Sequence, residues 1–323
     1  MTRVVFMGTP AFALPTLERL IESYEVVGVL TQPDRRAGRG QRMVASPVKE
    51  MALAHGLPVL QPRTLRRPEA VEQLRALGPE VIVVAAYGLI LPPAVLEIPP
   101  HGCLNIHASL LPKYRGAAPI PAAILAGEAE TGITIMLMDE GMDTGPILSQ
   151  ARLAIEPHDT TQSLSEKLAP LGADLLMETL PRWLEGEIEP RLQDESQASY
   201  CKLIHKEDGL INWSLPAIQI ERAVRAYTPW PSAYTFWEGR LLKILRAQPL
   251  VAWSGHREPG QVMELPQGIA VATGQGALLL EEVQLAGRRA MGAEEFVRGQ
   301  RRFVGATLGN HEGKASYEGE ARL

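Results

Sequence analysis

The sequence has two cysteines in 323 residues and no apolar segment long enough to cross a bilayer. Cys103 and Cys201 lack the spacing of metal ligands and are too few for a disulfide framework, so we expect no metal site and a buried thiol at Cys103. The apolar run VIVVAA at 81–86 is far shorter than the roughly 20 residues of a membrane helix. The N-terminus also lacks a signal-peptide pattern, which predicts a cytoplasmic protein without membrane contact.

Two nucleotide-binding motifs are missing as well. After the first expected strand the sequence reads GTPAFALP, without the spacing G-x-G-x-x-G, and G-x-x-x-x-G-K-[ST] occurs nowhere, which disfavours a bound dinucleotide. The net charge of −5 argues against a general affinity for polyanions. Residues 34–42, DRRAGRGQR, nevertheless carry four arginines. This segment is either a solvated flexible loop or a loop that contacts phosphates.

The pattern that is present predicts an α/β protein with two domains. A length of 323 residues, with 46% hydrophobic and 21% charged residues, suits a globular chain of that size. Apolar segments at 3–9, 25–31, 81–88 and 103–107 alternate with helical patterns such as 46–56 and 69–78. This alternation predicts a doubly wound, mostly parallel sheet. Because ligands bind beyond the carboxyl ends of such strands, Gly8, Thr31, Tyr87 and His107 should surround one crevice.

The remaining sequence predicts a second, smaller β domain. Residues 131–155 read as two strands around an acidic turn, and 162–186 as a long helix with a possible interruption at Pro170. We therefore expect a first domain at 1–186, a polar linker at 187–204, a barrel or sandwich of short strands at 205–309 and a flexible tail at 310–323. We expect Trp230, Trp237 and Trp253 to belong to the barrel core.

Two polar side chains end an otherwise apolar strand. In GCLNIHASLLPKYRGAAPI, residues 102–120, Asn105 and His107 alternate along the strand and so point to one side, with Ile106 opposite. An amide beside an imidazole suits the stabilisation of a developing oxyanion and the handling of a proton. Asp143 in the turn MDEGMDTG is the carboxylate best placed to orient His107. A lone buried histidine is more often structural, so the prediction of a catalytic site depends on Asn105, His107 and the acidic turn occurring together.

These segments resemble the 10-formyltetrahydrofolate-dependent formyltransferases. LNIHASLLPKYRGAAPI and ETGITIMLMDEGMDTGPIL are similar to the family's Asn-x-His strand, its S-L-L-P loop and its later acidic turn. The branch that formylates methionyl-tRNA is the most similar, because FMGTPAFALPTLERL, VVGVLTQPDRRAGRGQR and the second half of the chain also match it. The resemblance covers almost the whole chain. It implies a Rossmann-like first domain and an OB-like, tRNA-binding barrel at 205–309.

The resemblance also implies a reaction and a set of site residues. A formyl group would pass from 10-formyltetrahydrofolate, without a metal, to the α-amine of methionyl initiator tRNA, for the initiation of translation, and we expect the enzyme to be a monomer. Asn105, His107 and Asp143 would be catalytic. The folate site would include Ser109, Leu110, Leu111, Pro112, Ile90 and Leu91, and the tRNA would contact Arg39, Arg36 and Arg42.

Three alternatives remain open. The same Asn-x-His chemistry would serve a formyltransferase acting on a sugar nucleotide or a purine precursor, or a hydrolase of formyl-folate. Neither is expected to combine TQPDRRAGRGQR with this second domain. A non-catalytic RNA-binding protein would require the three polar residues to be merely structural.

Overall fold

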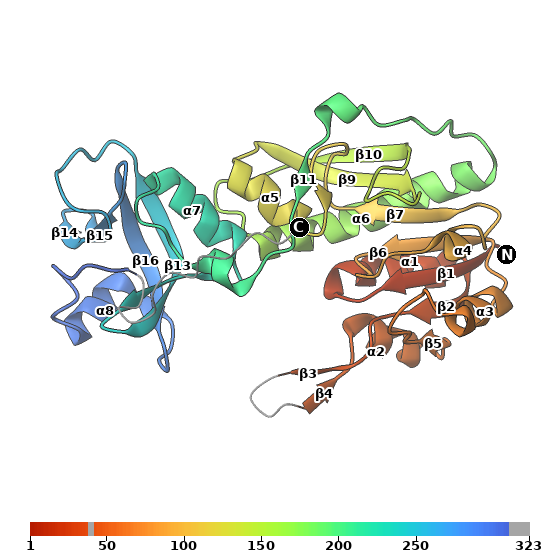
Figure 1. Ribbon diagram of the computed structural model, residues 1–323, viewed down its shortest axis with the longest axis horizontal. Helices are drawn as coiled ribbons and strands as arrows, with labels where there is room; N and C mark the ends of the chain where they lie inside the picture. The colour runs from red at the N-terminus through yellow and green to blue at the C-terminus, as the bar shows by residue number, and fades with distance from the viewer. Residues whose placement is uncertain (38–41, 310–323) are drawn as a thin grey trace. The chain divides into compact units, whose positions relative to one another are not determined.

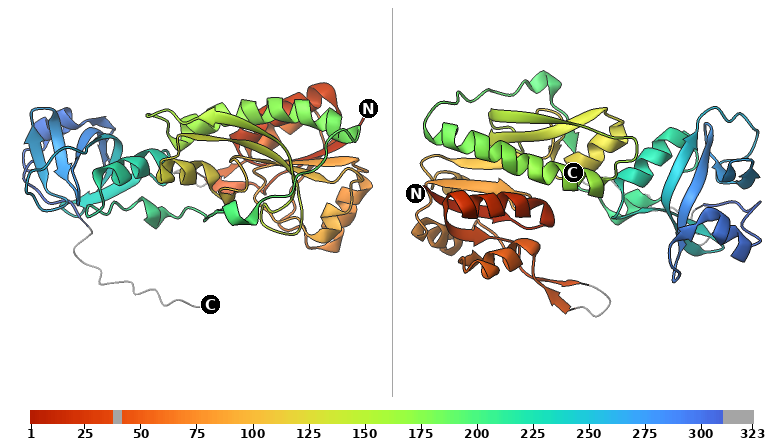
Figure 2. Two further views of the ribbon diagram at one scale, coloured as in Figure 1. Left: turned by 90° about the horizontal axis from the view of Figure 1, so that it is seen from above. Right: turned by 180° about the vertical axis from the view of Figure 1, so that it is seen from behind.

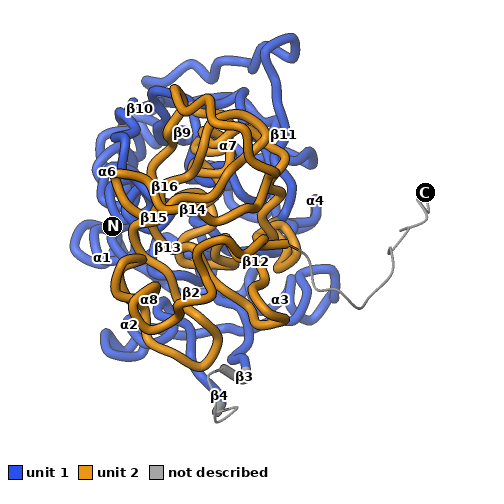
Figure 3. The backbone as a smooth tube through the Cα atoms, turned by 90° about the vertical axis from the view of Figure 1, so that its left-hand side faces the viewer, with its two compact units in different colours: residues 1–123, 128–203 blue, residues 124–127, 204–323 orange. Residues whose placement is uncertain are grey.

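The computed structural model describes residues 1–37 and 42–309 and divides into two compact units (Figure 3). Unit 1 comprises residues 1–123 and 128–203, and unit 2 comprises 124–127 and the chain from 204 onward. Arg39 and the expected tail at 310–323 lie outside the described residues. Among the described helices, none is long and apolar enough to span a membrane.

Unit 1 is built on a seven-stranded, mostly parallel sheet (Figure 1). Its strands, in spatial order, are β10 (Ile147–Ala154), β9 (Glu130–Leu137), β7 (Cys103–His107), β6 (Val81–Ala85), β1 (Arg3–Gly8), β2 (Glu25–Leu30) and β5 (Val59–Leu60). The strands from β7 to β5 run parallel, β9 runs antiparallel to β7, and β10 runs antiparallel to β9. The expected Rossmann-like sheet and the expected strand pair at 131–155 are both confirmed.

Helices cover both faces of this sheet. They are α1 (Leu14–Ser23), α2 (Pro47–Ala54), α3 (Pro68–Ala76), α4 (Pro93–Leu96), α5 (Pro119–Ala126) and α6 (Thr161–Leu184), with a short 3-10 turn η1 (Ala11–Ala13) before α1. Proline in the first turn begins several of them, where no backbone N–H donor is lost. The long helix α6 lies along the sheet beside α1 (Figure 2). It continues through Pro170, where the sequence suggested an interruption.

A glycine on α6 sets the distance between this helix and the strand that carries the polar pair. A Cβ atom on Gly172 would lie 2.9 Å from Ile106 Cγ2 and 3.5 Å from Ile133 Cδ1. Ile106 is buried on the face opposite Asn105 and His107, as the alternation along the strand requires. Close packing behind β7 therefore fixes the strand from which the polar side chains project.

We predict that Gly172→Val destabilises unit 1 by about 1–3 kcal/mol, because the added methyl groups overpack the contact with Ile106. Urea unfolding of the variant measures the loss. The same substitution at Gly299, where nothing lies within 4 Å of the added Cβ, is the control. Equal effects at both positions would contradict the packing argument.

Unit 2 contains an antiparallel sheet closed by a returning segment. The sheet order is β12 (Ala233–Trp237), β13 (Arg240–Leu250), β16 (Ala277–Leu285), β15 (Gly268–Ala272) and β14 (Val262–Leu265), with β17 (Met291–Gly292) beside β16. Val262 N donates to Ala306 O at 2.8 Å, and Phe236 N donates to Gly309 O at 3.0 Å. Residues 306–309 therefore connect the two edge strands β14 and β12, which gives the expected small barrel.

The barrel is packed around aromatic side chains and flanked by two helices, α7 (Ala217–Ala226) and α8 (Ala293–Gly299), with a 3-10 turn η3 (Lys206–Gly209). Trp237 is buried and meets Phe296 and Phe303 edge to face. The expectation for Trp230 was wrong, because 59% of its surface is exposed. It follows α7 on a proline-rich turn, TPWP, which carries the ring away from the core.

Candidate active site

Strand β7 presents Asn105 and His107 at the edge of the sheet where the parallel strands end. The strand lies between β6 and β9, with Asn105 opposite Val84 on one side and Met136 on the other. The His107 ring is buried and Asn105 is half-buried. Buried strands on both sides leave these two side chains little freedom, so the sheet itself positions them.

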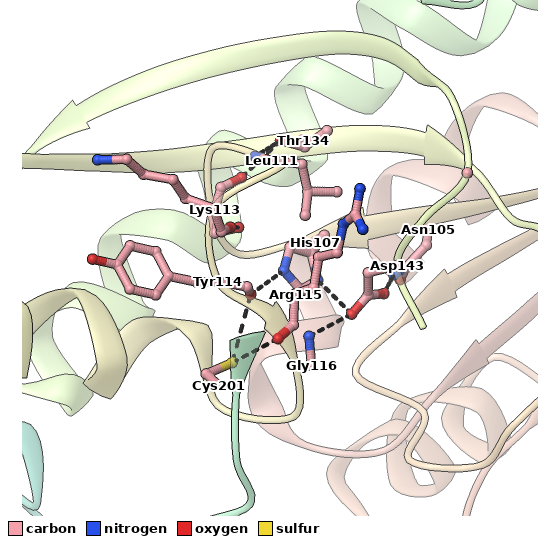
Figure 4. A network of polar contacts seen from close by, with 12 residues as sticks. Asn105, His107, Leu111, Lys113, Tyr114, Arg115, Gly116, Thr134, Asp143 and Cys201 are labelled. Atoms are coloured by element: carbon pink, nitrogen blue, oxygen red, sulfur yellow. Dashed lines mark hydrogen bonds and ion pairs between the residues drawn. The ribbon is translucent and has the colours of Figure 1, made fainter. Parts of the chain in front are cut away.

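The carboxylate of Asp143 joins the pair from the turn between β9 and β10 (Figure 4). Its Oδ1 accepts from Asn105 Nδ2 at 3.3 Å, and its Oδ2 lies 3.6 Å from His107 Nδ1. Gly116 N donates to Oδ2 at 2.8 Å. Asp143 adopts a left-handed backbone conformation, with φ of 55°, which aspartate tolerates better than most residues. The three residues singled out in the sequence therefore meet.

A backbone carbonyl occupies the other side of the imidazole. His107 Nε2 lies 3.0 Å from Tyr114 O, so a hydrogen bond there requires the proton on Nε2. Both ring nitrogens thus face oxygen atoms, Nδ1 that of Asp143 and Nε2 that of Tyr114. Tyr114 also has a left-handed backbone conformation, with φ of 60°. Such a conformation in a tyrosine needs support from the surrounding structure.

The support comes from residues 187–203, which we call the strap. This segment lies within unit 1 and contains a 3-10 turn, η2 (Glu195–Gln197), and a strand, β11 (Tyr200–Cys201), which pairs in parallel with β8 (Arg115–Gly116). Gln193 Nε2 donates to Asp143 O at 2.8 Å and to Gly145 O at 2.7 Å. The sequence indicated a linker here, whereas the segment packs against the active-site loops.

The basic loop after β7 has a structural explanation. Lys113 pairs with Glu128 at 3.0 Å. Arg115 is fully buried, and its guanidinium donates to both carboxylate oxygens of Glu195, at 2.7 and 2.9 Å, and to Gln193 Oε1. The hydrogen bond from Arg115 lowers the pKa of Glu195, and the same contact raises the pKa of Arg115. This bidentate pair ties the strap to the loop.

A cavity of about 400 Å³ opens at the same edge of the sheet. Segments that follow β1, β2 and β6 line it, together with the end of β4 (Arg42–Val44) and the start of α2. The lining residues are Thr9, Pro10, Gln32, Pro33, Arg35, Val44, Ala45, Ser46, Pro47, Ala86, Tyr87 and Gly88. A crevice is therefore present beyond the ends of three of the four strands. Of the four residues expected to surround it, only Tyr87 lines the cavity; Thr9 and Gln32, which follow Gly8 and Thr31, line it in their place, and His107 does not.

The residues assigned to folate lie around the loop after β7 and after β6. Ser109 is buried and donates to Lys113 O at 2.6 Å, and Leu111 N donates to Thr134 Oγ1 at 3.1 Å. Leu110 and Pro112 are half-buried beside them. Ile90 exposes 69% of its surface, whereas Leu91 is packed in the core. Ile90 is exposed and can contact a ligand directly. Leu91 is buried, so it could affect a ligand only by fixing the conformation of the loop.

The arginine-rich segment forms a two-stranded hairpin. Arg36 belongs to β3 (Arg35–Ala37) and Arg42 to β4, and the two strands pair in antiparallel fashion. Arg39 falls outside the described residues. Arg35 and Val44 from this hairpin line the cavity, so the base of the arginine-rich segment adjoins it.

Sequence reasoning missed the residues that support the three polar side chains. Two of the contacts are made by backbone atoms, Gly116 N and Tyr114 O. The third comes from Gln193 in the strap, whose sequence has no periodic pattern. A weak signal was present in Arg115, a basic residue between two apolar segments. Its burial could not be inferred without the partner Glu195.

Comparison with known proteins assigns the class. The family model described as formyl transferase matches residues 2–180, and that of the formyl transferase C-terminal domain matches residues 203–301. The fold and the site are thus those of an enzyme that transfers formyl groups. A methionyl-tRNA formyltransferase of Chloroflexus aggregans is 55% identical over 300 residues, covering 92% of this chain and 97% of the relative. One of Magnetococcus marinus is 51% identical, covering 95% and 98%. The chain belongs to the methionyl-tRNA formyltransferase family.

Solved structures share the fold. An N-formyltransferase of Helicobacter canadensis, in complex with folinic acid and dTDP-3-aminofucose, matches 87% of this chain and 99% of its own, with a TM-score of 0.66 and 21% identity. A methionyl-tRNA formyltransferase of Clostridium thermocellum matches 77% and 93%, with a TM-score of 0.54 and 17% identity. At these identities the comparison concerns architecture alone.

The lowered pKa of Glu195 predicts a pH-dependent stability. A carboxylate with a lowered folded-state pKa stabilises the fold above its ordinary value, about 4.3, and the contribution is lost as the pH falls through the lowered value. Glu195→Gln should therefore melt below the unsubstituted protein at pH 7, with the difference shrinking toward pH 3. Thermal unfolding at several pH values measures this. A difference independent of pH would show that the charge of Glu195 does not contribute.

Proposed function

We propose that the protein transfers the formyl group of 10-formyltetrahydrofolate to the α-amine of methionine esterified to initiator tRNA. The observation that carries the proposal is the meeting of Asn105, His107 and Asp143 in a chain whose relatives, at about half identity over nearly full length, are methionyl-tRNA formyltransferases. The substrate is a tRNA that works in translation initiation. We propose that the enzyme acts in the cytoplasm as a monomer.

The competing acceptors have weaker support. The sugar-modifying neighbour is 21% identical and therefore bears on the fold alone. The relatives at 51–55% identity cover both units of the chain, including the barrel. A non-catalytic RNA-binding protein would have no need of a carboxylate, an amide and an imidazole in mutual contact.

The reaction needs a place for negative charge. When the amine attacks the formyl carbon, the carbonyl oxygen becomes an oxyanion, which preorganised N–H donors stabilise. One amide hydrogen of Asn105 is directed to Asp143, and no contact among the described residues accounts for the other. We assign that second N–H, with the His107 ring, to the oxyanion. For His107 this means transferring a ring N–H from Tyr114 O to the substrate oxygen.

We assign two roles to Asp143: it orients the His107 imidazole and it transfers the proton of the attacking amine. Its carboxylate faces His107 Nδ1 and so holds the imidazole in orientation. As the new C–N bond forms and the bond between the formyl carbon and N10 breaks, the amine loses a proton and N10 gains one. We assign this transfer to Asp143, directly or through one water, because general bases act within hydrogen-bond reach.

The two substrates would approach from neighbouring loops. We assign the formyl donor to Ser109, Leu110, Leu111 and Pro112, with Ile90 and Leu91 on the adjoining loop, where residues 109–112 lead directly from His107. We assign the aminoacyl end to the 400 Å³ cavity, whose wall contains the base of the arginine-rich hairpin. We assign contacts with tRNA phosphates to Arg36, Arg39 and Arg42.

The proposed function is tested with purified protein, formyl-tetrahydrofolate and methionine-charged tRNA. We expect formyl-methionine on initiator tRNA and much less on elongator tRNA. Formylation of an aminosugar nucleotide instead, or hydrolysis of the formyl donor without an acceptor, would replace the proposal by the corresponding alternative.

Asn105→Ala should lower kcat by about 10²–10³-fold, the effect of removing one oxyanion donor. Single-turnover kinetics with charged initiator tRNA measures the chemical step. Near-normal turnover of the folded variant would exclude Asn105 from this role.

Asp143→Asn should lower kcat at least as much, because the amide cannot accept the amine proton and no longer presents two carboxylate oxygens to Asn105 and His107. The variant keeps the size of the side chain, so its melting temperature reports separately on structure. Preserved turnover per folded molecule with reduced thermal stability would identify Asp143 as structural.

Arg39→Ala should weaken tRNA binding and flatten its dependence on salt, since each lost phosphate contact reduces counterion release. Binding of charged tRNA at several salt concentrations measures the slope. An altered KM for the formyl donor with unchanged tRNA affinity would contradict this assignment.

A further inference from the structure

The strap holds both oxygen acceptors of His107. We propose that Gln193 is a positioning residue for the transfer reaction, and that Ser199 completes the same function on the opposite side of the ring. The inference rests on the proposed function for its kinetic consequence. Its structural part, the orientation of His107 by the strap, stands on the contacts alone.

The side chain of Gln193 uses all of its hydrogen-bonding capacity. Its amide nitrogen donates to Asp143 O and Gly145 O, and its Oε1 accepts from Nε and Nη2 of Arg115 at 3.0 and 2.9 Å. Two donors and two lone pairs are the full inventory of a primary amide. Four contacts leave the group one orientation. Gln193 therefore joins the buried Arg115 to two carbonyl groups of the turn between β9 and β10, those of Asp143 and Gly145.

The contact with Asp143 bears on the direction of its carboxylate. The left-handed backbone of Asp143 turns the side chain toward Gly116 N and His107. Loss of the two donors would leave the carbonyl groups of Asp143 and Gly145 without the Gln193 contacts that hold the turn. A shift of the Asp143 Cα atom would carry the carboxylate with it, because the side chain is attached there.

Ser199 acts on the loop that supplies the second acceptor. Its Oγ accepts from Tyr114 N at 2.9 Å, its carbonyl accepts from Arg115 N at 2.8 Å, and its own N–H donates to Pro112 O at 3.2 Å. The strap thus fixes the peptide whose oxygen, Tyr114 O, lies 3.0 Å from His107 Nε2. Gln193 and Ser199 are six residues apart in sequence and hold opposite sides of one imidazole.

The composition of the strap argues for this role over simple core building. Leu192, Tyr200 and Leu203 are exposed, and Ile188 is half-buried. The Tyr200 hydroxyl accepts from Arg115 at 3.0 Å, so its contact with the fold is a hydrogen bond as well. Glu195 is 70% exposed, although it neutralises a buried arginine. Since little apolar surface is buried, directional hydrogen bonds are what the segment contributes. Those bonds converge on the two loops around His107.

The decisive variant is Gln193→Met, which keeps the length of the side chain and removes all four hydrogen bonds. We expect kcat to fall up to about 100-fold, the effect of a small misplacement of a reacting group, with KM for both substrates within about two-fold. The ring ¹⁵N resonances of His107, assigned by their absence in His107→Gln, should shift. Gln162→Met is the matched control, because Gln162 Nε2 also donates a hydrogen bond, to Glu166 Oε1 at 3.0 Å, but on the exposed surface of α6.

Ser199→Ala provides a milder second variant in case Gln193→Met fails to fold. It should also move the His107 resonances and lower kcat with little change in KM. A reduced melting temperature with unchanged kcat per folded molecule and unchanged His107 resonances would overturn the proposal. Should the unsubstituted protein fail to formylate methionyl-tRNA, the proposed function falls, and the His107 resonances still test the positioning by themselves.

Discussion

The carboxylate of Asp143 is shared among three partners, and the geometry of the site depends on that sharing. One oxygen accepts from Asn105, and the other accepts from Gly116 N while it faces the His107 ring. A carboxylate has the lone pairs for all three, whereas a neutral side chain of the same size does not. The strand, the loop after it and the turn between β9 and β10 must therefore keep their mutual register, which the close contact of α6 with Ile106 enforces from behind.

The parts of the site that could be predicted are those that follow from local sequence patterns, such as the two-residue alternation of side chains along a strand. Asn105 and His107 share a face because side chains alternate along a strand, and the apolar segment around them predicted that strand. Asp143 was recognisable as the acid before the second strand of a predicted pair. The alternation of strands and helices likewise predicted the sheet, and with it the crevice at the strand ends.

The parts that could not be predicted depend on contacts between residues far apart in the sequence, which local patterns do not reveal. Gln193 meets Asp143 across 50 residues of chain, from a polar segment with the composition of a linker. From the sequence, Arg115 would be expected at the surface, and its burial depends on the ion pair with Glu195. Trp230 was assigned to the barrel core on its size alone, whereas the proline-rich turn leaves it exposed. Backbone groups such as Gly116 N carry no residue-specific signal at all.

The closure of the barrel has a consequence for synthesis on the ribosome. Strands β12 and β14 become neighbours through residues 306–309, so a nascent chain that has emerged only as far as α8 still has two open strand edges. Unpaired edges invite pairing with other chains. The second unit thus stays vulnerable to aggregation until almost all of its residues have left the exit tunnel, whereas the sheet of the first unit can already be complete.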